Sequence, residues 1–167
     1  SGVGVTSDIR FLHRENAVFA SSPGGMLSLR VDDETYPVVY LHCSFPHSDP
    51  ERYISVRLPD DKEVGMIRSL SDFGGQTAEL LREHIRIRYF APAILSIKSI
   101  REEFGYSFWE AETTAGTCRF TVRSGGGNVK TVTDKKLLIT DVSGNRFVIE
   151  DIGKLSDREY RLVEMCM

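Results

Sequence analysis

The sequence predicts a strand-rich α+β fold, built mainly from antiparallel hairpins, with one central helix and a short C-terminal helix. Most apolar residues lie in short alternating or β-branched segments that are separated by turn-forming Gly, Pro, Asn and Asp. Sustained helical spacing occurs in a single long segment, residues 76–88. With 41% apolar and 27% charged residues in a chain of 167, the composition is that of a globular protein able to build a core.

The first half of the chain is expected to contain two hairpins. Residues 26–31 and 36–41 are rich in β-branched and aromatic side chains and flank an acidic turn. Residues 53–58 and 64–70 form a second pair around a turn of Pro and Asp. Residues 45–50 contain two prolines, which interrupt a strand and therefore indicate a loop between the pairs.

Two helices are expected. In residues 76–88, apolar side chains recur at helical offsets, and Pro92 ends the helix because it cannot donate a backbone hydrogen bond. Near the C-terminus, Ser156 and Glu159 have the spacing of a capping box, in which each side chain accepts a hydrogen bond from a free amide at a helix start.

The second half continues with strands. Apolar alternation runs through residues 94–104, and four further strands are expected at 107–112, 118–122, 137–140 and 147–149. The short glycine-containing connections between them imply antiparallel pairing.

The chain shows no internal repeat or long linker. We therefore interpret residues 1–25 as an N-terminal arm or edge segment and residues 26–167 as a single α+β domain. Residues 1–5 lack the basic flank and long apolar stretch of a signal peptide, and are interpreted as an expression remnant or a processed end.

Composition excludes several functions. The net charge of −3, without long runs of either sign, favours no nucleic-acid partner, and the apolar runs fall far short of the roughly 20 residues that insert into a membrane. Cys43, Cys118 and Cys166 are few and widely spaced, which favours reduced thiols and a cytoplasmic location.

Two short motifs could bind a ligand. His42, Cys43, His47 and Asp49 are metal-ligand types, but neighbouring strand residues face opposite sides of a sheet, so no metal is expected. The loop Gly125–Gly126–Gly127–Asn128 could offer amides to an anion, yet it lacks the P-loop pattern and is interpreted as a flexible hairpin loop.

No recognisable arrangement of catalytic groups is present. Acidic pairs lie at hairpin tips or on opposite strand faces, and there is no nucleophile turn or activated Cys–His pair. We therefore expect no enzyme, no catalytic residues and no cofactor. His84, on the apolar face of the long helix, is interpreted as partly buried and hydrogen-bonded, with a titrating switch as the alternative.

Several distinctive segments follow one another along the chain: Phe45–Pro46, Tyr53–Ile54–Ser55–Val56, Glu63–Val64–Gly65, Arg88–Tyr89–Phe90, Phe104–Gly105–Tyr106–Ser107–Phe108–Trp109–Glu110 and Asp141–Val142–Ser143–Gly144–Asn145–Arg146–Phe147. Together these segments resemble a bacterial family of domains of unknown function, DUF1854, from about residue 26 to the C-terminus. The resemblance implies a companion of ABC transporters, encoded beside or joined to them, and some members are named for an association with cyanophycin metabolism. It supplies no catalytic or ligand residues.

The leading functional hypothesis is an accessory or regulatory interaction module that docks on ABC transporter subunits or on itself. Its expected surface includes Tyr89, Phe90 and Trp109, because Tyr, Trp and Arg anchor interfaces well. Alternation places Tyr106 and Phe108 on one face of their strand and Trp109 on the other.

The alternative is a small-ligand sensor or an unrecognised enzyme. Its pocket would bring together polar groups such as Arg57, His84 and Arg146.

Overall fold

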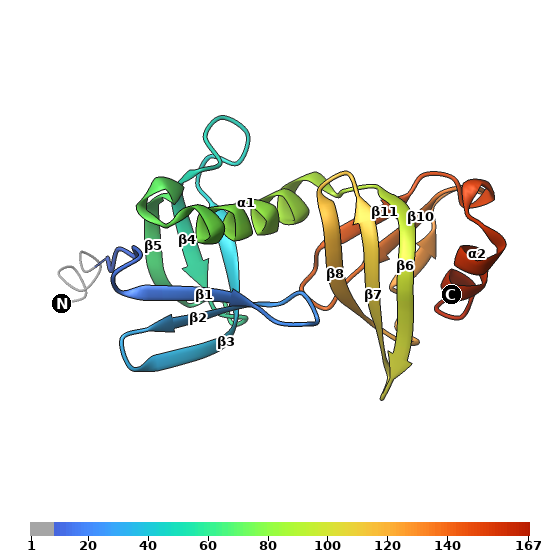
Figure 1. Ribbon diagram of the computed structural model, residues 1–167, viewed down its shortest axis with the longest axis horizontal. Coiled ribbons are helices and arrows are strands. Elements are labelled where there is room, and N and C mark those ends of the chain that lie inside the picture. Colours follow the sequence, from blue (N-terminus) through green and yellow to red (C-terminus); the bar gives the residue numbers. More distant parts are fainter. Residues whose placement is uncertain (1–8) are drawn as a thin grey trace. The chain divides into compact units, whose positions relative to one another are not determined.

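The structure is a computed structural model that describes residues 9–167 (Figure 1). It confirms an α+β fold with antiparallel strands, a longer central helix and a short C-terminal helix. The interpretation of residues 1–5 as a remnant or processed end lies outside the described residues. Contacts group the described residues into two compact units, residues 9–22 with 27–85 and residues 23–26 with 86–167. The assignment of residues 26–167 to one domain stays a prediction.

The first unit contains a five-stranded antiparallel meander. Both predicted hairpins are present, and a further strand precedes them, because the segment before the first glycine turn pairs with the second strand. In spatial order the strands are β1 (Ala17–Ser21), β2 (Leu27–Val31), β3 (Glu34–Cys43), β4 (Arg52–Arg57) and β5 (Glu63–Ser69).

The chain just before β1 links the two edges of this sheet. Phe11 forms a parallel bridge with Met66 of β5; the Leu12 amide donates to the Met66 carbonyl, and the Met66 amide donates to the Arg10 carbonyl, both at 2.8 Å. Leu12 is almost fully buried. The outer edge of β5 is therefore partly covered by the segment that leads into β1.

A single turn of 3₁₀ helix, η2 (Leu70–Asp72), leads into the long helix α1 (Gly75–Phe90). The predicted helix of residues 76–88 is thus confirmed with slightly wider limits. Leu81 and Ile85 are buried at the predicted spacing. On the solvent-facing side of the helix, Arg82 forms ion pairs with both Glu79 and Glu51 at 2.9 Å. The helix ends before Pro92, and residues from 86 onward group with the second unit.

The second unit consists of two antiparallel three-stranded sheets and two short helical segments. The strands of one sheet are β6 (Ile94–Glu103), β7 (Tyr106–Thr113) and β8 (Gly116–Arg123), and those of the other are β9 (Val129–Thr131), β10 (Leu137–Thr140) and β11 (Arg146–Ile149). They are followed by η3 (Ile152–Lys154) and α2 (Asp157–Glu164). The expected strands are present. The short β9 was not expected, because two of its three residues are polar, and they are exposed in the structure.

An aromatic stack joins the two sheets. Trp109 stacks on Phe120 with ring centroids 5.4 Å apart, and Phe120 stacks on Phe147 of the other sheet at 3.9 Å. Ile139 is fully buried in the same cluster. The inner faces of the two sheets therefore share one core.

Candidate functional site

The β6–β7 hairpin ends in an unusual two-residue turn. Glu103 pairs with Tyr106, which leaves Phe104 and Gly105 as the loop. Both have positive φ, +51° and +83°, as a type I′ turn requires. The first position of such a turn favours Asn, Asp or Gly, yet here it holds a phenylalanine that is 96% exposed.

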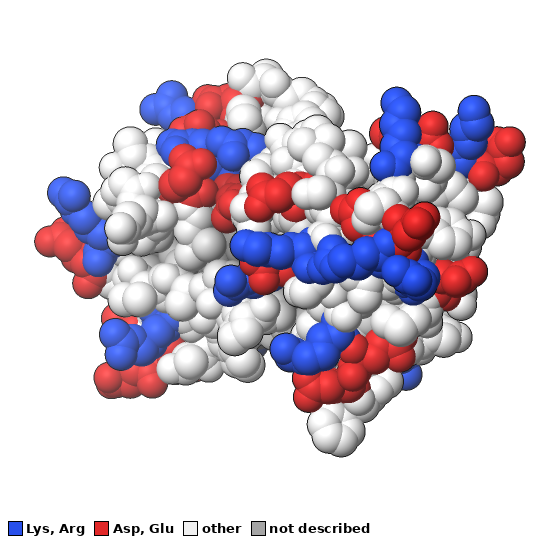
Figure 2. All heavy atoms as spheres, turned by 45° about the vertical axis from the view of Figure 1, so that its right-hand side comes forward, with Lys and Arg blue, Asp and Glu red and all other residues white. Residues whose placement is uncertain are grey.

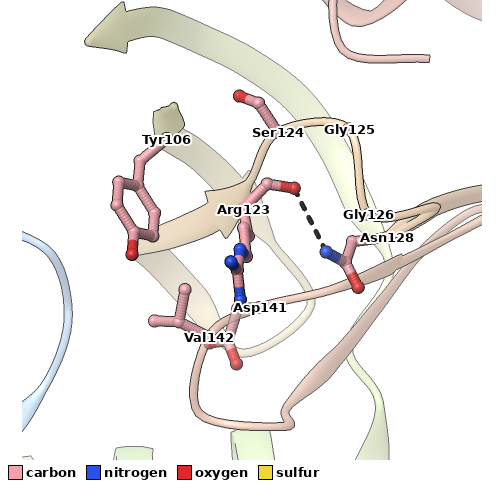
Figure 3. A pocket seen from close by; sticks show the side chains of 8 residues that line it. All are labelled: Tyr106, Arg123, Ser124, Gly125, Gly126, Asn128, Asp141 and Val142. Carbon is pink, nitrogen blue, oxygen red and sulfur yellow. Dashed lines mark hydrogen bonds between the residues drawn. The ribbon is translucent and has the colours of Figure 1, made fainter. Parts of the chain in front are cut away.

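A pocket of about 660 Å³ lies beside this turn, where the start of β7, the end of β8, the glycine loop and the turn after β10 meet. Strand register explains its composition, because Tyr106 of β7 pairs with Arg123 of β8 and directly opposed residues point to the same face. In Figure 3 the Arg123 side chain lies between Tyr106 and Asn128, with Asp141 and Val142 below it. The lining residues are Tyr106, Arg123, Ser124, Gly125, Gly126, Asn128, Asp141 and Val142.

The glycine loop that borders this pocket is held in place by Asn128. The Asn128 side-chain amide donates to the Arg123 carbonyl at 3.1 Å, and the backbone carbonyl of Asn128 accepts from the Thr140 amide at 2.8 Å. Between these anchors, no backbone acceptor is found within the described chain for the amides of Gly125, Gly126 and Gly127. The loop is therefore anchored at its two ends, and its glycine amides are open donors; the expected flexibility of the loop stays a prediction.

Asp141 supplies the one carboxylate of the pocket lining. Its Oδ1 accepts from the amides of Ser143 at 2.9 Å and Asn145 at 2.8 Å, and its Oδ2 accepts from the Asn145 side chain at 3.3 Å. Burial raises the pKa of Asp141 to about 6, against the lowering effect of these hydrogen bonds. With a pKa of about 6 the carboxylate is still mostly ionised at pH 7, and it organises its own turn through these hydrogen bonds.

A smaller hollow of about 260 Å³ lies on the outer face of β6, β7 and β8. Arg101 lies over the Phe108 ring at 5.3 Å, and Glu110 is flanked by Lys98 at 3.7 Å and Arg119 at 3.8 Å. In Figure 2 basic and acidic side chains lie next to one another. This face is mixed in charge, and its charged groups are already paired.

The residues predicted for a ligand pocket are not brought together within either unit. In the first unit, Arg57 donates to Ser55 at 3.0 Å and pairs with Asp61 at 3.1 Å, while His84 lies on α1. Arg146 is exposed on β11 of the second unit. The half-burial of His84 is confirmed, but its imidazole has no hydrogen bond within the described part of the chain, and burial lowers its pKa to about 4.

The predicted aromatic surface is also divided. Phe90, at the end of α1, is 53% exposed and Tyr89 is half-buried. The prediction that Trp109 lies on the surface is wrong. Its side chain is 2% exposed and stacks on Phe120, and its indole N–H donates to the Ser107 hydroxyl at 2.9 Å. A buried indole in a stacked core contributes stability rather than an interface.

The His and Cys residues at the end of β3 form separate contacts. His42 lies 3.9 Å from Asp61, and the Cys43 thiol donates to the Pro50 carbonyl at 3.5 Å. Across residues 9–167, no group of three or more His, Cys, Asp and Glu side chains is placed to hold a metal ion.

The pocket residues Tyr106, Arg123 and Asp141 were not identified as a site from the sequence. Alternation indicated that Tyr106 points away from Trp109, but its neighbour depends on the register of β8. A turn of two residues after Thr113 sets that register and so places Arg123 opposite Tyr106. The sequence signal that could have paired Tyr106 with Arg123 was therefore the length of the turn between their strands, not a motif.

Comparison with known proteins identifies the family. Residues 36–166 match the domain of unknown function DUF1854, and the chain belongs to this family. No curated protein and no solved structure matches the chain. Among the described residues, no helix has the length and apolar character needed to span a membrane.

Proposed function

We propose that this chain is an accessory or regulatory interaction module, and that the Phe104–Gly105 turn is its docking element. The observation that carries the proposal is the 96% exposure of Phe104 at a positive φ of 51°. A non-glycine residue in the left-handed region costs about 1 to 2 kcal/mol. Burying a phenylalanine contributes roughly 1.5 to 3 kcal/mol, which this side chain can obtain only from another molecule.

The partner we propose is a subunit of an ABC transporter, which the chain would bind in the cytoplasm. The resemblance of the chain to companions of such transporters supports this choice. Exposed aromatic side chains surrounded by polar residues are typical anchors of protein interfaces. Arg101 and Glu103, close to the turn, are exposed and would form the polar rim.

Co-expression with the transporter proteins encoded by the neighbouring genes tests the proposal. We expect stoichiometric co-purification with the native chain and a loss of about tenfold or more in recovery for Phe104→Asn, since Asn suits the turn but lacks the ring. Phe45→Asn is the matched control, because Phe45 is also exposed, at 51%, but lies in another loop.

Two results would overturn this proposal. Equal recovery with Phe104→Asn would remove the turn as the docking element. Self-association of the native chain that Phe104→Asn abolishes, measured by light scattering after size exclusion, would replace the transporter by a second copy. Because Asn relieves backbone strain, Phe104→Asn should be at least as stable as the native chain, so lost binding would not reflect unfolding.

The alternative function, a small-ligand sensor, is supported by a different observation. The pocket bordered by Arg123 and the glycine loop has the volume of a small-molecule site, about 660 Å³.

A further inference from the structure

We propose that the pocket between the Tyr106–Arg123 pair and the glycine loop is a binding site for an oxyanion, such as a phosphate or carboxylate group of a small molecule. This site adjoins the Phe104–Gly105 turn, since Tyr106 follows Gly105 and the Ser124 amide donates to the Gly105 carbonyl at 2.8 Å, but it does not include the Phe104 side chain. The proposal therefore stands whether or not Phe104 docks. It rests on the donors that face the pocket, on how these donors are held, and on the state of the one carboxylate beside them.

The first argument is the excess of unused donors. Within the described chain, the exposed Arg123 guanidinium has neither an ion-pair nor a hydrogen-bond partner, so its donors are open to a ligand at the pocket that it lines. Gly125 and Gly126 line the same pocket, and their backbone amides have no backbone acceptor within the described chain. An arginine fork together with open loop amides is a combination that binds oxyanions by charge-assisted hydrogen bonds.

The second argument is preorganisation. The Asn128 amide donates to the Arg123 carbonyl at 3.1 Å, which closes the loop directly behind the arginine. A side chain at Gly126 would come within 2.8 Å of the Asn128 side-chain nitrogen, so the approach of Asn128 requires a glycine there. Since the loop is held by these contacts, little ordering cost would remain for a ligand to overcome.

The third argument is that Asp141 does not occupy the Arg123 guanidinium. Its oxygens are occupied by donors from Ser143 and Asn145, at 2.8 to 3.3 Å, so it does not pair with Arg123. The Val142 amide is likewise occupied by the Thr121 carbonyl at 2.9 Å. The acidic residue therefore shapes the floor of the pocket, and the guanidinium stays available.

Amide NMR of the full chain tests the site with inorganic phosphate and with acetate as separate probes. We expect saturable shifts of the Gly125 and Gly126 resonances. Arg123→Gln should weaken the affinity about tenfold or more, because it removes the charge-assisted hydrogen bonds of the guanidinium. Arg146→Gln is the matched control and should leave the titration unchanged, since Arg146 is exposed in the same unit but outside the pocket.

The two probes separate the possible sources of the anion. Saturation by phosphate alone assigns the site to a phosphate-bearing ligand, saturation by acetate alone assigns it to a carboxylate, and saturation by both supports a general oxyanion site. The proposal is overturned if neither probe gives saturable glycine shifts, or if Arg123→Gln binds as the native chain does. Dispersed amide spectra of the variants show that folding is intact. Transporter co-purification does not enter this readout, so the two proposals can fail separately.

Discussion

The carboxylate of Glu159 accepts a hydrogen bond from the backbone amide of Ile97, with 2.6 Å between Oε2 and the nitrogen. Its other oxygen accepts from the Ser156 amide at 2.9 Å and completes the capping box of α2. Beside it, Arg158 donates to the carbonyls of Ile97 and Lys98. One helix start thus satisfies the outward-facing backbone groups at a bulged part of the edge strand β6, where unpaired groups would otherwise invite another strand.

Glu159→Ala is expected to lower the free energy of unfolding by about 2 to 3 kcal/mol, because it removes half of the capping box and leaves the buried Ile97 amide without an acceptor. Urea denaturation measures the loss, and amide hydrogen exchange at Ile97 should accelerate. Glu164→Ala is the control, since Glu164 is exposed at the end of the same helix, and should change stability by less than about 0.5 kcal/mol. Similar effects of the two substitutions would contradict the edge-capping role.

Gly25→Ala is expected to be one of the most damaging substitutions in the second unit. Gly25 has a φ of +84°, and an added Cβ would lie 1.8 Å from the Arg119 carbonyl oxygen. Gly144→Ala separates the two effects, because Gly144 has a φ of +82° with nothing within 4 Å of the added carbon. Thermal unfolding should show a loss of about 1 kcal/mol for Gly144→Ala, from backbone strain alone, and well over twice that for Gly25→Ala. Equal losses would mean that the loop moves away from β8 without cost.

The capping box and the long helix could be predicted because their signals are local. Ser156 and Glu159 lie one turn apart, and the apolar residues of α1 recur at offsets of three and four. The second partner of Glu159 could not be predicted, since Ile97 is distant in sequence and is reached only when α2 packs beside β6. Local patterns thus fixed where the helix begins but not what its first turn contacts.

The position of Trp109 shows a different limit. Alternation correctly separates Trp109 from Tyr106 and Phe108, but a period of two does not say which face is buried. The opposite sheet decides this, because Phe147 stacks on Phe120 and Phe120 on Trp109. The pocket residues were missed for a related reason: Arg123 meets Tyr106 through strand register, and Asp141 reaches them from the other sheet.

The difference in stability between Asp141→Asn and the native chain is expected to depend on pH. The pKa of Asp141 rises from 3.8 to about 6 on folding, so between these values the folded state binds more protons than the unfolded state. Its contribution to the free energy of unfolding is full below pH 3.8 and is lost as the pH rises through 6. As the pH rises through this window, the free energy of unfolding of the variant should therefore increase relative to that of the native chain by up to about 1.4 kcal/mol per pH unit. Above the window this difference should not change further. Urea titrations at several pH values measure this, and a difference that stays constant from pH 4 to 6 would contradict the raised pKa.

His84 should act in the opposite direction. Burial lowers its pKa from 6.5 to about 4, so between these values the unfolded state binds more protons, and the free energy of unfolding falls as the pH falls below 6.5. His84→Leu removes the titrating group. As the pH falls from 6.5 to about 4, its free energy of unfolding should increase relative to that of the native chain by up to about 1.4 kcal/mol per pH unit, as measured by urea denaturation. The slopes of His84 and Asp141 oppose each other between pH 4 and 6, which flattens the pH profile of the native chain there. Each single variant should therefore show a steeper profile than the native chain, with opposite signs, and a His84→Leu profile parallel to the native one would show that this imidazole is not buried in solution.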